Sequence, residues 1–123
     1  MLEQYVRAFE ARDAGAVAEM MNRHGLVEIP MLKPNRLVGG MEIERGHVAA
    51  FETIVEARFR LGEAAENGEQ AIATGALSVK RVGGEERTTP VGIVAEMADG
   101  GLQRVSLYLD ARNQRLWSDK AIL

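Results

Sequence analysis

A carboxylate beside an aromatic residue near the C-terminal end is the pair of side chains in this chain that is best suited to chemistry. Trp117 and Asp119 are two positions apart, so in an extended segment both lie on one face, opposite to Leu116. If Trp117 lines a cavity, Asp119 points into it and can serve as a general base. Alternatively, the opposite face is buried and Asp119 pairs with Arg87 or Arg104 at the surface. The alternation is compatible with both interpretations.

We expect the two histidines, His24 and His47, to have structural roles and not catalytic ones. His24 lies at the end of a predicted helix, where a basic side chain interacts favourably with the carbonyl end, and His47 is expected to be exposed or half-buried on a later helix. No histidine and carboxylate stand at metal-binding spacing, and no glycine-rich loop joins a strand to a helix, so we expect neither a metal nor a cofactor. The absence of cysteine excludes disulfides and thiolate ligands.

Composition indicates one globular domain over residues 1–123. The chain is 46% apolar and 27% charged, which is typical of a single domain with its own core. Its net charge is −3 and no basic cluster is present, which disfavours a nucleic-acid partner. No apolar stretch approaches the ~20 residues of a membrane helix, and the charged N-terminus does not read as a signal peptide. We therefore expect a cytoplasmic protein without a membrane partner.

Three amphipathic helices are predicted in the first half of the chain. Residues 2–12 form the first, Asp13 caps the second, which stops near Gly25, and residues 42–57 form the third. Apolar residues at helical spacing define their buried faces: Leu2, Tyr5, Val6 and Phe9, then Val17, Met20 and Met21, then Val48, Phe51, Ile54 and Val55.

The second half is predicted to form strands, because the apolar period there shortens to about two and turn residues recur. The expected strands span residues 58–66, 69–82, 86–98, 102–111 and 114–122. Consecutive turns would join them as an antiparallel meander. Pro90 cannot donate a ladder hydrogen bond, so its strand is expected to be an edge or bulged there.

Helices followed by strands predict an α+β domain, with three N-terminal helices packed in the concavity of a curved antiparallel sheet. Such a sheet can leave an apolar pocket for a small apolar molecule, and its uncovered convex face favours a homodimer. The expected core consists of Val6, Phe9, Val17, Met21, Phe51, Val55, Ile93, Val105 and Leu107.

The order of elements and two sequence strings resemble a known superfamily. YVRAFEARDAGAVAEMM, followed by a short strand GLVEIP, is similar to the SnoaL-like domains of the nuclear transport factor two-like superfamily. The resemblance covers nearly the whole chain and implies a cone, or cystatin-like roll, with a pocket for a small molecule. Ketosteroid isomerases, polyketide cyclases and limonene epoxide hydrolases share this fold, so the resemblance supports the fold more than the chemistry.

Of the three functional residues of ketosteroid isomerases, this chain has a matching residue at only one position. Tyr5 matches the helix-one tyrosine of their oxyanion hole, and it could equally be a buried aromatic residue whose hydroxyl bonds to a neighbour. Ile29 stands where the general base would be and Gly92 where the protonated acid would be. An isomerase or cyclase would therefore need another base, such as Glu28.

The C-terminal string RVSLYLDARNQRLWSDKAI is similar to limonene epoxide hydrolases, whose Trp-x-Asp motif supplies the base that activates water. The resemblance implies Asp119 as the base and Arg87 as the residue that orients it. Thr89 stands at the position of the second acid, and Leu26 and Glu28 fall near the positions that hold the water. Because threonine cannot protonate an epoxide, two hypotheses stay open: a hydrolase and a non-catalytic binding module.

Together these residues predict one pocket between the first two helices and the concave face. Arg87 shares a face with Thr89 and could meet Asp119 across the sheet, which would keep that carboxylate ionised. Apolar walls around one carboxylate and one guanidinium would suit a small neutral molecule with one or two oxygen atoms. The expected lining is Tyr5, Met20, Leu26, Glu28, Arg87, Thr89, Trp117 and Asp119.

Overall fold

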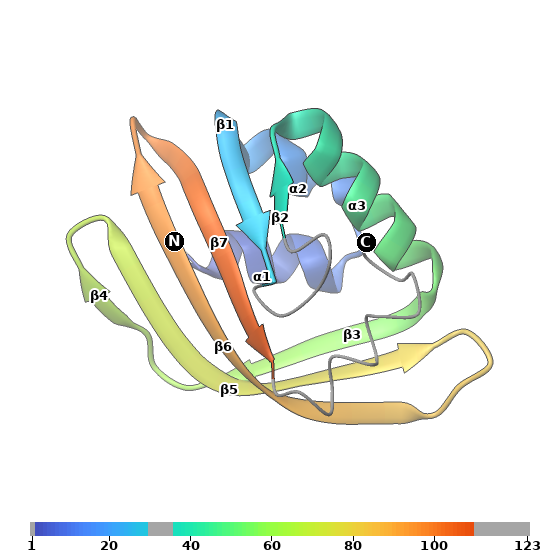
Figure 1. Cartoon of the computed structure of the whole chain (residues 1–123). Coiled ribbons are helices and arrows are strands. Elements are labelled where there is room, and N and C mark those ends of the chain that lie inside the picture. Colours follow the sequence, from blue (N-terminus) through green and yellow to red (C-terminus); the bar gives the residue numbers. More distant parts are fainter. Residues whose placement is uncertain (1, 30–35, 110–123) are drawn as a thin grey trace.

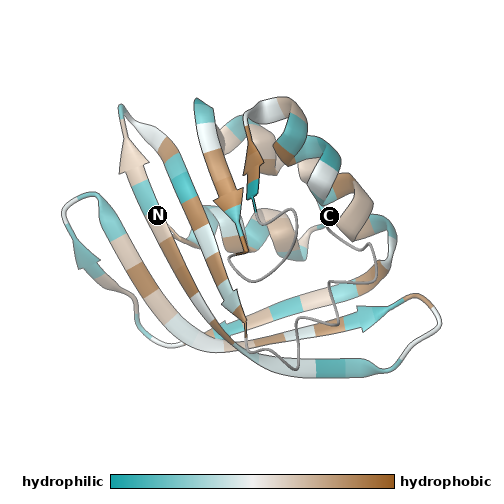
Figure 2. Ribbon diagram, in the orientation of Figure 1, coloured by the Kyte–Doolittle hydropathy of each residue, from teal (hydrophilic) through white to brown (hydrophobic). Residues whose placement is uncertain are grey.

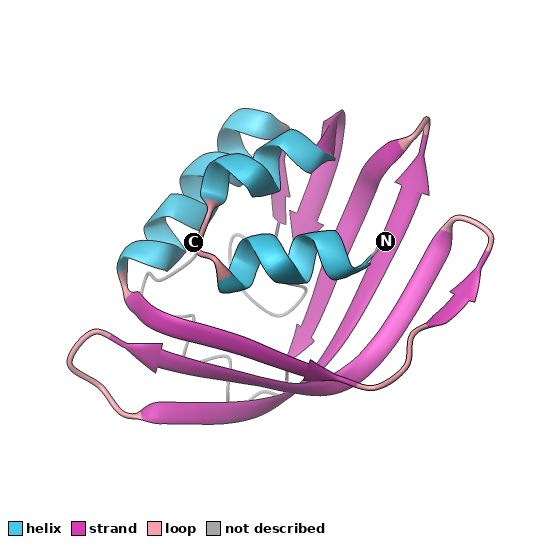
Figure 3. Cartoon of the chain, turned by 180° about the vertical axis from the view of Figure 1, so that it is seen from behind, coloured by secondary structure: helices cyan, strands magenta, loops and turns pink. Residues whose placement is uncertain are grey.

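Three helices cover the concave side of one curved sheet in the computed structural model, which describes residues 2–29 and 36–109 (Figures 1 and 3). They are α1 (Leu2–Glu10), α2 (Ala14–Met20) and α3 (Gly40–Glu52). Figure 3 shows α1 lying across the sheet, with α2 and α3 beside it. This arrangement confirms the predicted α+β class. None of the described helices is long and apolar enough to cross a membrane.

The helix starts agree better with the sequence than the helix ends. Asp13 caps α2 as predicted, because its Oδ1 accepts a hydrogen bond of 3.0 Å from the backbone N–H of Ala16. The predicted extension of α2 toward Gly25 is wrong, since Met21 already has an extended backbone. The predicted extension of the third helix to residue 57 is also wrong: Thr53 donates its hydroxyl to the Ala50 carbonyl oxygen, and a strand follows.

Seven strands form the sheet within the described residues. Their order is β2-β1-β7-β6-β5-β3, and β4 pairs with β5 at one end. The strands are β1 (Met21–Glu28), β2 (Arg36–Val38), β3 (Ile54–Leu61), β4 (Ala65–Asn67), β5 (Gln70–Arg81), β6 (Glu86–Ala98) and β7 (Gly101–Leu109).

The meander prediction is confirmed for β3 to β7: β3 and β4 pair antiparallel with β5, β5 with β6, and β6 with β7. β1 comes from the predicted helical half and lies beside β7 in parallel, with Val27 opposite Val105. Turn residues cannot signal such a pair, because parallel strands are not joined by a hairpin. The predicted strand over 58–66 is two strands, β3 and β4, and the predicted strand over 114–122 lies outside the described residues.

Two residues of the long, curved strands β5 and β6 are unusual for a sheet, Gly75 and Pro90. The pairing register shows which strands lie beside each of them. Pro90 lies just beyond Val91 and Leu109, the last residue pair between β6 and β7, so only β5 flanks it in the described chain. Because the position opposite Pro90 on the β7 side falls outside the described residues, the predicted edge stays a prediction. Gly75 of β5 lies against β3, and a Cβ there would collide with the carbonyl oxygen of Arg60.

The core fills the space between the helices and the inner sheet face. Apolar and polar residues alternate along β5, β6 and β7 (Figure 2), and the inward residues are buried. Val6 is only partly buried, and Val55 was wrongly assigned: it is 44% exposed because it belongs to β3 and not to a helix. The other predicted core residues are confirmed: Phe9, Val17, Met21, Phe51, Ile93, Val105 and Leu107.

Candidate functional site

Five rings from three elements form an aromatic cluster beneath α1 and α3. Phe9 is at its centre, with its ring 5.1 Å from that of Phe51 and 5.4 Å from that of Phe59. Tyr5 and His47 complete the cluster, their ring centroids lying 6.0 and 6.3 Å from that of Phe9. All five side chains are buried, so the inner end of the cone is a largely apolar environment.

One hydrogen-bonded pair brings polarity into this cluster. The Tyr5 hydroxyl lies 2.8 Å from Nε2 of His47, and Nδ1 of His47 lies 2.8 Å from the Ile43 carbonyl oxygen. A carbonyl oxygen can only accept, so Nδ1 carries the proton and Tyr5 donates to Nε2. Burial lowers the pKa of His47 to about 4, despite the hydrogen bond to Ile43, and burial raises the pKa of Tyr5. Both groups are therefore uncharged at neutral pH.

The sequence expectation for His47 was wrong, since the side chain is 3% exposed. A signal existed in the sequence: Ile43, His47, Ala50 and Phe51 stand at i, i+4, i+7 and i+8 and form one buried helix face. For Tyr5, the structure shows a buried aromatic residue with a partner for its hydroxyl. Its predicted role in ligand binding is not tested by this contact.

Arg87 and Thr89 lie on the inner face of β6, as their spacing predicts. Thr89 is opposite Leu77 and Arg87 is opposite Val79, and both partners on β5 are buried. Thr89 is itself fully buried and its hydroxyl donates to the Pro90 carbonyl oxygen over 3.1 Å. The side chain of Arg87 is exposed. Trp117 and Asp119, which should meet it, lie outside the described residues.

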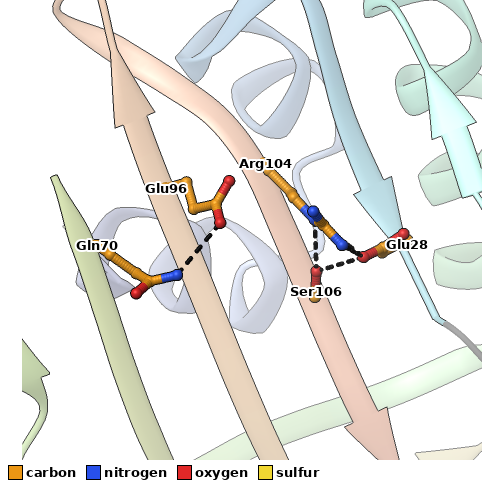
Figure 4. A network of polar contacts seen from close by, with 5 residues as sticks. All are labelled: Glu28, Gln70, Glu96, Arg104 and Ser106. Carbon is orange, nitrogen blue, oxygen red and sulfur yellow. Dashed lines mark hydrogen bonds and ion pairs between the residues drawn. The ribbon is translucent and has the colours of Figure 1, made fainter.

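Leu26 and Glu28 lie on the opposite face from the one expected. Val27 between them is buried against the core, so its two neighbours point to the outer face of the sheet. Glu28 accepts hydrogen bonds there from the Arg104 guanidinium and, over 2.8 Å, from the Ser106 hydroxyl (Figure 4). An isomerase with Glu28 as its base inside the cone therefore receives no support from the geometry.

The polar network on the outer face holds Glu28 ionised. Burial on its own would raise the pKa of this carboxyl, but the hydrogen bonds from Arg104 and Ser106 and the positive charge of Arg104 together lower it. The hydrogen bond to Glu28 raises the pKa of Arg104 in turn. Gln70 donates a separate hydrogen bond of 3.2 Å to Glu96 on the same face (Figure 4), and the negative charge of Glu96 also raises the pKa of Arg104.

An open cavity of about 480 Å³ lies between α1, the end of β3 and the loop that follows it. We call it the α1–β3 cavity. It does not contain any of the described residues that the sequence predicted for the site; Met20 lines a different open depression, at the end of α2. Its apolar lining consists of Leu2, Val6, Phe59, Leu61, Gly62, Ala64 and Ala73, and its charged lining of Glu3, Arg7, Glu10 and Glu63.

Sequence reasoning missed this cavity because its lining comes from separate elements. Leu2 and Val6 were assigned to the buried face of the first helix, and Leu61 to a strand, but nothing in their spacing places them together. Within the described ranges, no three His, Cys, Asp or Glu side chains gather closely enough to hold a metal ion. The cavity therefore offers apolar contact and charge, without a ready metal site.

Comparison with known proteins agrees with this fold. The sequence model of the SnoaL-like domain matches residues 2–105. No protein of curated function matches the chain.

Among solved structures, an M. tuberculosis LEH-like epoxide hydrolase superposes with a TM-score of 0.77 at 15% identity, covering 94% of this chain and 84% of the other. A protein with a ketosteroid isomerase-like fold from Catenulispora acidiphila gives 0.79 at 10% identity, with coverage of 89% and 85%. An NTF2-like protein of unknown function from Burkholderia pseudomallei gives 0.77 at 24% identity, with coverage of 94% and 92%. These likenesses concern the fold.

Proposed function

This chain belongs to the SnoaL-like domain family, and we propose that it binds a small, largely apolar molecule in the α1–β3 cavity. The apolar lining of the cavity is the observation that carries the proposal; its volume of about 480 Å³, which other open depressions match, falls within the range of roughly 300–1,000 Å³ that is usual for ligand sites. The seven apolar lining residues, which we call the apolar floor, include Phe59, and Phe59 connects the cavity to the aromatic cluster through its contact with Phe9. A bound apolar group would thus be removed from water on several sides.

A cavity-filling substitution tests this function. Ala73 is buried on β5 and lines the cavity, so Ala73→Leu should fill part of it and weaken binding of 1-octanol at least about tenfold. Ala76→Leu is the matched control, because it adds the same bulk to the outer face of the same strand. Binding is measured by methyl chemical shifts of Val6 and Leu61. Equal affinities in the two variants would place the ligand elsewhere.

A second candidate function is epoxide hydrolysis with Asp119 as the base and Arg87 as the residue that orients it. The likeness to the LEH-like epoxide hydrolase and the inner-face position of Arg87 support it. In this reaction Asp119 accepts a proton from water, and the oxygen of that water forms a bond to an epoxide carbon while the C–O bond of the ring at that carbon breaks. The opened oxygen takes a proton from solvent water to give a diol, and Asp119 returns its proton to solvent. Diol formation from limonene oxide is the assay. Turnover that survives Asp119→Asn would remove Asp119 from the mechanism, and no turnover at all would favour the binding module.

We also propose that the chain forms a homodimer through the outer face of the sheet. Ile72 and Tyr108 lie on this face and are 43% and 47% exposed, and a face shared by two copies would cover both. Light scattering at micromolar concentration should give twice the chain mass of 13.5 kDa, and Tyr108→Glu should give the single-chain mass. A single-chain mass for the unsubstituted protein would contradict the proposal.

A further inference from the structure

The charges that line the α1–β3 cavity are mainly negative. Glu3, Glu10 and Glu63 contribute three carboxylates, and Arg7 contributes one guanidinium. Glu3 and Arg7 stand four residues apart on α1, at a spacing where opposite charges on a helix attract each other. Arg7 also stands three residues before Glu10, so its one positive charge faces two carboxylates of α1. Three carboxylates and one guanidinium leave the lining with a net negative charge, to which Glu10 and Glu63 contribute.

Glu10 is held in place by the sheet. Its Oε2 accepts a hydrogen bond of 2.8 Å from the backbone N–H of Phe59. β3 is the last strand on its side of the described sheet, so this contact joins α1 to the open edge. A carboxylate has about four acceptor positions, and the bond to Phe59 uses one of them. The remaining positions can accept from a ligand without moving the helix.

Glu63 reaches the cavity from the loop between β3 and β4. Glu10 and Glu63 thus come from two elements and line the same cavity as the apolar side chains of Leu61 and Val6. An ammonium group suits two such carboxylates, because each of its N–H groups can form a charge-assisted hydrogen bond. An alkyl chain suits the apolar floor. Anionic ligands would be repelled by the same carboxylates.

We infer that the α1–β3 cavity binds an alkylamine, with the ammonium group on Glu10 and Glu63 and the alkyl chain on the apolar floor. This inference rests on the proposed binding function, and it concerns a different site from the one at which Arg87 and Asp119 predict a neutral ligand. The ligand class is therefore a cationic amphiphile with one short chain.

Three probes with the same chain length test the inference by titration calorimetry at pH 7. They are n-octylamine, which is protonated at this pH, 1-octanol, which is neutral, and octanoate, which is anionic. We expect octylamine to bind about tenfold more tightly than octanol, and octanoate to bind most weakly, because hydrogen bonds to charged groups are the stronger ones. The preference for octylamine should shrink as salt is added.

Paired substitutions locate the charge effect. In Glu10→Gln with Glu63→Gln, octylamine and octanol should bind with similar affinity, while the affinity for octanol should stay unchanged. The Gln carbonyl oxygen can still accept from the Phe59 N–H, so the contact between α1 and β3 is kept. Glu66→Gln with Glu69→Gln is the control, since it removes the same charge from exposed positions outside the cavity and should keep the preference.

The outcomes separate the two proposals. Equal binding of octylamine and octanol to the unsubstituted protein would overturn the amine inference and leave the cavity as an apolar site. A preference that survives the Glu10 and Glu63 substitutions, or that disappears equally in the control, would also overturn it. If none of the three probes binds, both the inference and the proposed function fail.

Discussion

The two faces of the sheet accommodate polar groups in opposite ways. On the inner face, Tyr5 and His47 are nearly inaccessible, and both are uncharged at neutral pH. On the outer face, Glu28 and Arg104 are charged, with side chains that are 14% and 40% exposed. The same alternation that buries Val27 turns Glu28 outward, and access to water then decides whether a polar residue must be neutral or can be ionised.

The difference follows from the cost of removing charge from water. An ion pair between the helices and the sheet would lose most of its hydration, whereas a neutral hydrogen bond loses much less. At the outer face the partly hydrated Arg104 can keep its charge while it satisfies Glu28 and Ser106. A charged catalytic group on the inner face would therefore need an opening to water or a partner.

The largest expected effect comes from removing the centre of the aromatic cluster. Phe9→Ala should lower the free energy of unfolding by about 3–5 kcal/mol, because Phe9 is fully buried and contacts the rings of four residues. Val55→Ala is the control: Val55 is an exposed residue of β3, so this change should alter the free energy of unfolding by less than about 0.5 kcal/mol. Urea denaturation measures both. A loss below about 1 kcal/mol for Phe9→Ala would mean that the cluster is loosely packed.

Acid should weaken the inner face through His47. Its folded pKa of about 4 lies below the ordinary value near 6.5, so its unfolded form binds the proton more readily. The stability it supports is complete above about pH 6.5 and is lost as the pH falls toward 4, to a total of about 3 kcal/mol at 1.36 kcal/mol for each pKa unit. The free energy of unfolding from urea titrations across this window should show the loss. His47→Gln should remove this part of the pH dependence, and an equal slope in both proteins would contradict the assignment.

The outer network should contribute less and respond to acid at a lower pH. Glu28→Gln should cost about 1–2 kcal/mol at pH 7, because it weakens hydrogen bonds to a charged group. Since the folded pKa of Glu28 is lowered, the difference between the two proteins should be largest above about pH 5 and shrink as the pH falls through the carboxyl range near 4. Glu56→Gln is the control: its bond to Arg58 is exposed and should matter by less than about 0.5 kcal/mol. If the difference in free energy of unfolding between the two proteins does not vary with pH, the charge of Glu28 does not contribute to stability.

Local features of this fold could be read from the sequence, and distant pairings could not. Asp13 was predicted correctly because a helix cap depends on the residue itself and its nearest neighbours in the chain. The start of β1 at Met21 was missed because its apolar spacing also suits a helix. β1 also finds its partner, β7, about 80 positions later in the chain.

In the candidate site too, local features could be predicted from the sequence and contacts between distant residues could not. Periodicity placed Tyr5 on the buried face of its helix, and the family register placed Thr89 on an inner strand face. The contact between Tyr5 and His47 joins residues 42 positions apart and has no sequence signature. The phase of Glu28 was misassigned because it was taken from a family register and not from the burial of its neighbour Val27. The α1–β3 cavity depends on how far α1 lies from β3, which no local pattern encodes.

The smallest expected effect is the loss of the Tyr5 hydroxyl. Tyr5→Phe should cost about 1 kcal/mol, because Nε2 of His47 would keep its buried position without the donor it has in the described structure. His47→Phe in the same background replaces both partners with apolar rings of similar size, so the double variant should lose less than the sum of the two single variants. Chemical denaturation of the four proteins at pH 7.5, where His47 is neutral in both states, measures this coupling energy. A coupling near zero would show that the hydroxyl and the imidazole stabilise the inner face independently, and that packing alone distinguishes it from the outer face.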